Sequence, residues 1–380
     1  MTRTPENGFP STPEQLLELG IDRLRKMLGQ QWEVVLEADA CRAEDLGHDA
    51  LITITSPDRS LTRRVLVETK PSWTPALLER ELLPRVSLMR RLSQDTAVLV
   101  IAPWISPQTR ALLSRWDCGY IDLTGNVSFR MNQPAIVLET QGAARDPRPR
   151  TAGAQRGLSG ARAGRLVRVL ADVRPTYRAT ELAETTGLSG AYVSRLLDTL
   201  EEEAIIRRRN KVVVKVDWEA LLRLRASETS LLRPGRFLGF LAPNGLDSFI
   251  GKLLEHQELH TSIALTGPLA ATKVAPLAIG GQGMLYATEE ATARLLEGQG
   301  LFPVNQGADV LLLQPPDTSP FFGVRQVDGL PHVALSQLVL DSLSGPGRLP
   351  AAGEAVLNYM RDHEKNWRLD DLDGIEFPPP

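Results

Sequence analysis

Apolar and polar residues follow one another along the first 140 residues in a pattern that predicts a layered α/β domain. Leucines recur near helical spacing in Pro13–Leu28, behind a start rich in Ser, Thr and Pro. Short apolar runs and further helical stretches then predict strands Trp32–Leu36, Ala50–Ile54 and Arg64–Val67, helix Pro75–Leu92, strand Ala97–Ala102, helix Ser106–Arg115, and a hairpin of Tyr120–Leu123 and Val127–Phe129. This order predicts an α/β sandwich with a mixed sheet.

The middle of the chain has a different periodicity. Ala161–Asp172 carries an apolar helical stripe, and a second short helix begins at Thr180. A tight turn ends at Ser189, which can cap a third helix, Gly190–Ala204. In that helix the residues at positions i, i+3, i+4 and i+7 are apolar: Val193, Leu196, Leu197 and Leu200. One face is therefore predicted to be core. Two β-like runs follow, Ile205–Arg209 and Val212–Val216.

The remaining residues predict a second α/β segment. Its expected strands are Ser262–Leu265, Met284–Ala287 and Asp309–Leu313, and its expected helices are Thr288–Glu297 and Val333–Leu343. A length of 380 residues suits two to three domains. Composition breaks then predict a domain at residues 1–144, a Gly/Ala/Pro/Arg-rich linker at 145–160, a second domain at 161–226, a third at 227–369 and a disordered acidic tail at 370–380.

Charge is distributed unevenly over these segments. The whole chain has a formal net charge of −3, but residues 145–225 alone carry +7 between two acidic flanks. This asymmetry indicates that the middle segment meets a polyanion. The longest apolar stretch, Ala97–Ile105, is too short to cross a bilayer, and the N-terminus has no signal-peptide core. Together with only two cysteines, these features predict a cytoplasmic protein without a membrane partner.

In the N-terminal domain, Asp49 opens one predicted strand and Glu68-Thr69-Lys70 closes the next. Carboxylates on adjacent strands can converge on one Mg²⁺, and alternation along the strand puts Glu68 and Lys70 on one face. The pattern resembles the PD-(D/E)xK restriction-endonuclease-like fold, with His48 where the motif has Pro. The resemblance implies catalytic roles for Asp49, Glu68 and Lys70 and metal binding by the two carboxylates, with Glu14 or Glu18 as a further carboxylate. The alternative is a solubilising pair at a strand end.

The middle segment resembles a winged helix-turn-helix domain of bacterial transcription regulators. The resemblance rests on the turn before Ser189, the third helix, and the following Ile205-Ile206-Arg207 run. A helix fits the major groove of DNA, where its N-terminal residues meet base edges. Base-edge contacts are accordingly predicted for Ser189, Tyr192, Ser194 and Arg195, and phosphate contacts for Arg207, Arg208, Arg209 and Lys211. A winged helix used only for protein contact is the alternative.

The C-terminal segment resembles the nucleotidyltransferase-like C-terminal domain of AbiEi-like antitoxins of type IV toxin–antitoxin systems. The resemblance rests on Ala264–Ala271, Gly307–Leu312 and the Ser336-Gln337…Leu340-Asp341 pattern. Nucleotidyl transfer needs paired carboxylates on the strand after the Gly loop. Here the strand Met284–Ala287 carries no carboxylate, and Asp309 has no second carboxylate two residues further on. This domain is therefore predicted to be non-catalytic.

These patterns predict a sequence-specific double-stranded DNA-binding protein, a transcriptional regulator that needs no cofactor to bind. One recognition helix reads only a few base pairs, which predicts a homodimer or a second DNA contact. The alternative is a Mg²⁺-dependent DNA endonuclease, in phage defence or DNA processing, targeted by the winged helix. A further alternative is an antitoxin whose partner is a toxin.

Overall fold

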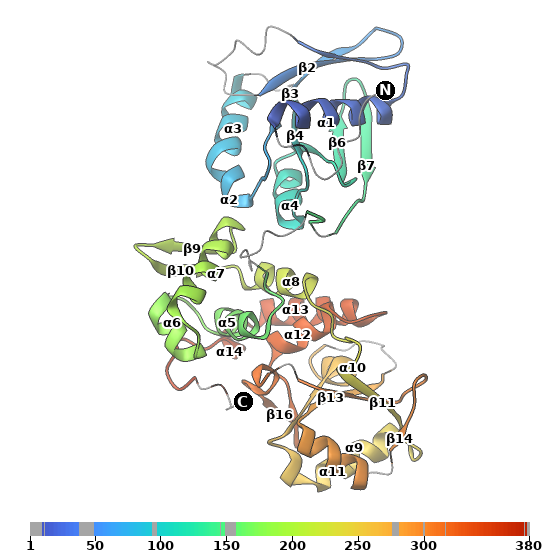
Figure 1. The fold of residues 1–380 in the computed structure, drawn as a ribbon, viewed down its shortest axis with the longest axis vertical. Coiled ribbons are helices and arrows are strands. Elements are labelled where there is room, and N and C mark those ends of the chain that lie inside the picture. The colour runs from blue at the N-terminus through green and yellow to red at the C-terminus, as the bar shows by residue number, and fades with distance from the viewer. Residues whose placement is uncertain are drawn as a thin grey trace. The chain divides into compact units, whose positions relative to one another are not determined.

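The computed structural model describes residues 10, 12–37, 49–92, 97–144, 146–148, 157–275, 281–298, 301–315, 317–375 and 377. The chain divides into two compact units. Unit 1 comprises residues 1–155 and 202–204, and unit 2 comprises residues 156–201 and 205–380. Both contain helices and strands (Figure 1), as expected for an α/β multidomain protein.

Unit 1 is built on one seven-stranded sheet whose strands are hydrogen-bonded in chain order. The strands are β1 (Glu33–Leu36), β2 (Ala50–Thr55), β3 (Thr62–Thr69), β4 (Ala97–Ala102), β5 (Gly119–Asp122), β6 (Val127–Met131) and β7 (Ile136–Thr140). Pairing is antiparallel except where β4 lies parallel to both β3 and β5. The predicted mixed sheet is present, with β7 in addition to the predicted strands.

Helices cover both faces of this sheet. On one face, α1 (Pro13–Leu28) packs over Val65, Val67 and Ile101. A Cβ at Gly20 of α1 would lie 2.5 Å from Ile101 Cδ1, so glycine permits this close approach. The opposite face, including Leu66 and Val100, is covered by α2 (Pro75–Leu77), the π-helical turn η2 (Leu78–Leu82), α3 (Leu83–Leu92) and α4 (Pro107–Arg115). The predicted Pro75–Leu92 helix is therefore continuous but contains a π-helical turn.

The first part of unit 2 is a small helical module with a three-stranded sheet. Its elements are α5 (Ala161–Asp172), β8 (Tyr177–Arg178), α6 (Ala179–Thr186), α7 (Gly190–Glu202), β9 (Ile206–Arg209) and β10 (Val212–Val216). The sheet order is β8-β10-β9, antiparallel throughout. The predicted core residues of the third helix, Val193, Leu196, Leu197 and Leu200, are all buried.

The rest of unit 2 follows α8 (Trp218–Ser227) and is built on a second seven-stranded sheet, in the order β14-β11-β15-β13-β12-β17-β16. Its strands are β11 (Phe237–Leu241), β12 (Ile263–Thr266), β13 (Gly283–Ala287), β14 (Phe302–Pro303), β15 (Val310–Leu313), β16 (Arg325–Val327) and β17 (Leu330–His332). Its helices are α9 (Gly245–Glu255), η3 (Gln257–Leu259), α10 (Gly267–Thr272), α11 (Glu289–Gly298), η4 (Ser319–Phe321), α12 (Leu335–Leu343), α13 (Leu349–Asp362) and α14 (Glu364–Trp367).

The two parts of unit 2 share one hydrophobic core. Helices α5, α8, α12 and α13 pack side by side (Figure 1), and one cluster of buried residues joins α5 and α7 to Met284 of the sheet. The other sheet face, with Leu285 and Leu312, packs against α9 and α11. This arrangement differs from the predicted separation of residues 161–226 from 227–369, because the apolar faces of α5 and α8 are covered by the C-terminal helices.

The segment after α14 also differs from the predicted disordered tail. Leu369 forms a parallel bridge with Val173, and Ile375 is buried. The ring of Phe377 stacks on Phe322 with centroids 4.6 Å apart. Apolar residues among the acidic ones thus attach this segment to unit 2. In the predicted linker, residues 145 and 149–156 lie outside the described residues.

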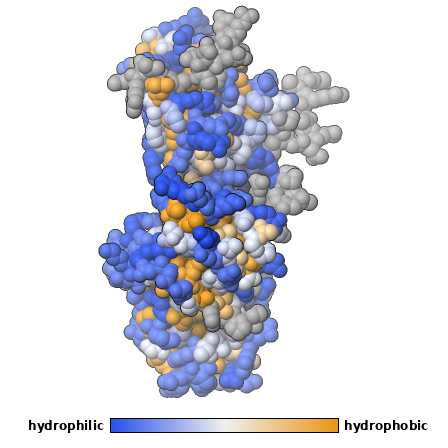
Figure 2. Space-filling view, turned by 90° about the vertical axis from the view of Figure 1, so that its left-hand side faces the viewer, coloured by the Kyte–Doolittle hydropathy of each residue, from blue (hydrophilic) through white to orange (hydrophobic). Residues whose placement is uncertain are grey.

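Hydrophilic residues cover most of the face drawn in Figure 2, with apolar residues in smaller areas between them. Among the described residues, no helix is long and apolar enough to span a membrane.

Candidate nucleic-acid interface

The α6–turn–α7 segment has the local geometry that its sequence predicts. Helix α6 ends at Thr186 and is capped by Gly187, whose φ of 66° is the left-handed conformation that suits glycine. The Ser189 carbonyl then accepts from the backbone N–H groups of Tyr192 and Val193, and its hydroxyl lies 3.4 Å from Tyr192 N. Ser189 therefore caps the start of α7, as the sequence suggests.

The solvent face of α7 carries small polar and cationic side chains. Ser189, Ser194 and Arg195 are exposed, and Arg195 Nε donates to Ala191 O at 3.2 Å. Tyr192 is half-buried and packs against the core cluster. Burial raises the pKa of Tyr192, and neighbouring guanidinium groups, that of Arg225 foremost, act against this rise. Three of the four predicted base-edge residues are thus freely accessible, and Tyr192 is accessible in part.

Strands β9 and β10 form a two-stranded hairpin after α7, the wing. Its tip residues Asn210 and Lys211 have φ of 49° and 65°, consistent with a tight two-residue turn. The side chains of Arg207, Arg209 and Lys211 are exposed. These three cations lie on one short hairpin and can reach the phosphates of a duplex.

Arg208 departs from the prediction that it contacts phosphate. Its backbone N–H donates to Glu201 Oε1 at 2.9 Å, and its Nε and Nη2 donate to Glu201 Oε2 at 2.9 and 2.6 Å. Nη2 also donates to Asp198 Oδ1 at 2.6 Å, and only 21% of the side chain is exposed. Because alternate residues of a strand point to opposite faces, Arg208 turns toward α7 while its neighbours face solvent.

Comparisons with known proteins bear on this segment. The family model for the IclR helix-turn-helix domain matches residues 159–210. No curated protein and no solved structure matches the chain. The match coincides with α5 through β9, so unit 2 contains an IclR-type helix-turn-helix DNA-binding domain. It covers a small part of the chain and supports DNA binding and a role in transcription regulation.

In unit 1, Asp49, Glu68 and Lys70 lie on one face of the sheet. Asp49 stands one step beyond the Ala50–Val67 pair of the β2–β3 ladder, which places it opposite Glu68. Leu66, two residues before Glu68, packs under α2–α3, so the acidic side chains point to that side. Glu14 and Glu18 lie on α1, which covers the opposite face. The prediction that one of them joins this group is therefore wrong.

Each member of the trio has a protein partner. Asp49 Oδ2 accepts from Thr69 N at 2.6 Å and Thr69 Oγ1 at 3.0 Å. Glu68 Oε1 lies 3.3 Å from Arg85 Nη1, and Lys70 Nζ lies 2.5 Å from Glu81 Oε2.

The ionisation of Glu68 reflects its surroundings. Burial raises the pKa of Glu68 to about 7, against the opposing charge of Arg85. Among the described residues, no group of three His, Cys, Asp or Glu side chains is placed to hold a metal ion. His48, at the position of the motif's Pro, lies outside the described residues.

Asp122 and Asn126 organise the turn between β5 and β6. Both are buried, and Asp122 Oδ1 accepts from the backbone N–H groups of Thr124, Gly125 and Asn126, each at 2.9 Å. Oδ2 accepts from Ile105 N at 3.2 Å. This carboxylate organises the β5–β6 turn.

A buried polar cluster around Asp341 joins α12 to the C-terminal sheet. Thr266 Oγ1 donates to its Oδ2 at 2.7 Å, and Tyr286 Oη and Gln337 Nε2 donate to its Oδ1, each at 2.8 Å. Burial raises the pKa of Asp341 to about 6, and these hydrogen bonds act against the rise. Asp309 lies elsewhere and accepts from Ala242 N at 3.1 Å.

Three arginines near this cluster were missed by the sequence analysis: Arg225, Arg233 and Arg236. They line a cavity with Asp341 and Tyr286. The signal available in the sequence was the Arg233-Pro234-Gly235-Arg236 run, which composition alone marks as a break between domains.

Proposed function

We propose that the protein is a transcriptional regulator that binds double-stranded DNA sequence-specifically, with α7 in the major groove and the wing along the backbone. The observation that carries this proposal is the exposed Ser194 and Arg195 on the face of α7 opposite its buried residues. Arg195 has the forked donor geometry that recognises guanine. Arg207, Arg209 and Lys211 supply the sequence-independent attraction to phosphate. Neither contact needs a cofactor.

The same geometry favours a homodimer as the DNA-bound form. One recognition helix contacts only a few base pairs, which gives too little discrimination against a genome. A two-fold pair of α7 helices on successive major grooves would double the site read. The main partner proposed is therefore a two-fold symmetric duplex.

Fluorescence anisotropy with the full-length protein and duplex DNA from upstream of its own gene tests the proposal. Affinity should fall linearly with log salt concentration, with a slope of about −0.9 for each phosphate contacted. Arg207→Gln/Arg209→Gln should make that slope shallower by about two. The matched control, Arg294→Gln/Arg348→Gln, removes two exposed arginines from elsewhere in unit 2. The proposal is overturned if both double variants lose DNA affinity equally, or if DNA affinity does not depend on salt concentration.

A second proposal concerns unit 1, where one observation favours Mg²⁺-dependent DNA cleavage. Asp49 and Glu68 face each other across the β2–β3 ladder, with Lys70 on the same face. Mg²⁺ is usually held by one or two carboxylates, with water and substrate phosphate completing its shell. Asp49 and Glu68 would hold the ion, and Lys70 would stabilise charge on the phosphate once Glu81 releases it.

Incubation of supercoiled plasmid with the protein and Mg²⁺ tests this second proposal. Nicking should appear with the wild type and disappear with Asp49→Asn and with Glu68→Gln. Glu79→Gln, which changes an exposed carboxylate of η2, should nick as the wild type does. No nicking, or nicking that survives both changes, removes the nuclease role and leaves the proposed DNA binding by unit 2 untouched.

A further inference from the structure

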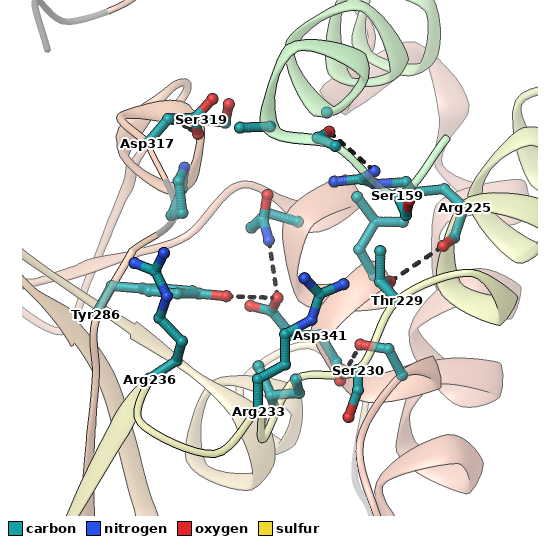
Figure 3. Close-up of a pocket in the computed structure, with 18 of the residues that line it drawn as sticks. Ser159, Arg225, Thr229, Ser230, Arg233, Arg236, Tyr286, Asp317, Ser319 and Asp341 are labelled. Carbon is teal, nitrogen blue, oxygen red and sulfur yellow. Dashed lines mark hydrogen bonds between the residues drawn. The ribbon is translucent and has the colours of Figure 1, made fainter. Parts of the chain in front are cut away.

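Unit 2 contains a cavity of about 300 Å³ with an unusual charge pattern. Its walls come from the N-terminal end of α5, from α8 and the segment that follows it, and from α12. Figure 3 shows Arg233 and Arg236 extending from one segment toward the space in front of Tyr286 and Asp341, with Arg225 on the far wall. The three guanidinium groups come from residues separated by at most eleven positions.

Arg225 is the deepest of these cations. It is 9% exposed, and Nη1 donates to Gly160 O at 3.1 Å. Burial lowers the pKa of Arg225 to about 10, which leaves the group charged at neutral pH. Within the described part of the chain, Arg225 forms no ion pair with a carboxylate, and neither does Arg233 or Arg236. The carboxylates of Glu228 and Asp317 favour the charged form of Arg225 without forming a salt bridge with it. An anion in the cavity would offset more of the cost of burying this cation.

The other charged groups of the wall have partners within the protein. Arg168 is fully buried and pairs with Asp172 at 2.9 Å. Asp317 pairs with Arg165 at 3.4 Å. Asp341 accepts from three neutral donors. The wall therefore keeps a net positive charge, because Arg225, Arg233 and Arg236 outnumber Asp341, the lining carboxylate that has no cationic partner among the described residues.

Two further features of the wall suit an anion. Gly160 and Ala161, at the start of the twelve-residue helix α5, line the cavity, and Gly160 makes no side-chain capping bond. The first N–H groups of a helix attract negative charge. Ser319 also lines the cavity, is 6% exposed, and its hydroxyl has no hydrogen-bond partner among the described residues. A ligand oxygen would satisfy it.

We propose that this cavity binds a small phosphate monoester, with the phosphate group held by Arg225, Arg233 and Arg236. Guanidinium groups pair with phosphate oxygens through two parallel hydrogen bonds, and three of them match a tetrahedral dianion better than a planar carboxylate. The cavity is larger than a phosphate group alone. Asp341 Oδ2 accepts one described hydrogen bond and retains capacity for another, so a hydroxyl group on the ligand fits beyond the phosphate.

Isothermal titration calorimetry on the full-length protein tests this site, at constant ionic strength set with sodium chloride. The probes are glycerol 3-phosphate, which carries phosphate and hydroxyl groups, inorganic phosphate, and citrate as a carboxylate. Glycerol 3-phosphate should bind saturably and more tightly than inorganic phosphate. Arg233→Gln/Arg236→Gln, in an exposed segment, should weaken binding at least tenfold with an unchanged circular dichroism spectrum. Arg294→Gln/Arg348→Gln should bind as the wild type does.

Three results overturn the assignment. Neither phosphate probe binds saturably, or citrate binds more tightly than both, or the two double variants lose affinity equally. The last result would show that the anions are attracted by the overall charge of the protein and not by a specific binding site. None of these measurements involves DNA, so their outcome is independent of the proposed regulator function.

Discussion

Arg208 of the wing and Glu201 of α7 are joined by three hydrogen bonds of 2.6 to 2.9 Å, one from the Arg208 backbone and two from its guanidinium group. The pair fixes the first wing strand to the helix that carries Ser194 and Arg195. Arg208 thus holds the wing against α7, while its exposed neighbours Arg207 and Arg209 remain available to contact DNA.

Replacing Arg208 should therefore affect stability more than salt dependence. Arg208→Gln is expected to lower the free energy of unfolding of unit 2 by about 1 kcal/mol, since a partly buried, multiply bonded ion pair is lost. The slope of DNA affinity against log salt should stay as in the wild type. Arg207→Gln should leave the free energy of unfolding within about 0.5 kcal/mol of the wild-type value and should make the slope of DNA affinity against log salt shallower. Urea denaturation and anisotropy measure both; a shallower slope for Arg208→Gln would contradict this assignment.

Arg195 should determine sequence preference. Arg195→Ala is expected to cost about 1 to 3 kcal/mol of binding to the preferred duplex and to relax discrimination at one base pair per half-site. Competition anisotropy with duplexes mutated one base pair at a time gives both values. Thr199→Ala, further along the same helix, serves as the control. If Arg195→Ala lowers affinity for all duplexes equally, Arg195 contacts only phosphate.

Asp122 should be indispensable to unit 1. Its side chain accepts hydrogen bonds from four backbone N–H groups, those of Ile105, Thr124, Gly125 and Asn126. Asp122→Ala leaves these buried donors without an acceptor and should destabilise unit 1 by about 3 kcal/mol or more. Asp146→Ala, which removes a partly exposed carboxylate of the same unit that pairs with Arg148 at 2.7 Å, should cost under about 1 kcal/mol. Thermal unfolding that shows equal effects would argue against this role.

Glu68 should make unit 1 less stable as pH rises. The pKa of Glu68 is raised from 4.5 to about 7 in the folded protein, so between these values the native state binds more protons than the unfolded chain. Stability linked to this group is therefore full below about pH 4.5 and is lost as pH rises through about 7. Glu68→Gln should flatten that loss, by at most about 3 kcal/mol.

Urea denaturation between pH 5 and pH 8 measures the effect. Glu79→Gln is the control, and its stability should follow the wild-type pH dependence because it removes an exposed carboxylate. If the wild type and Glu68→Gln show the same pH dependence, the Glu68 carboxyl is ionised throughout this range.

Local patterns predicted much of the fold. The α1 helix, the Ala97–Ala102 strand, the Ala161–Asp172 helix and the Val212–Val216 strand begin and end where the sequence places them, because caps and apolar periodicity act over a few residues. The β7 strand was missed, since three of its five residues are exposed and its apolar run is brief.

Features that depend on distant residues were less accessible. A run of three arginines does not show which of them pairs with a carboxylate and which face solvent, so the pairing of Arg208 with Glu201 was not predicted. The packing of α5 and α8 against α12 was likewise not predicted, because composition places a domain boundary after residue 226 while the hydrophobic core continues across it. The gathering of Arg225, Arg233 and Arg236 around one cavity depends on that packing.

Arg168 shows why the helix-turn-helix domain depends on the C-terminal part of unit 2. It lies in α5, yet its guanidinium donates to Ser319 O, Phe322 O and Gln337 Oε1, more than 150 positions further along the chain. A fragment ending soon after the wing would retain this charge with a single carboxylate and would present the apolar sides of two helices to water. The helix-turn-helix domain therefore cannot be moved to another protein by itself, and fusions or truncations need to retain the C-terminal helices with it.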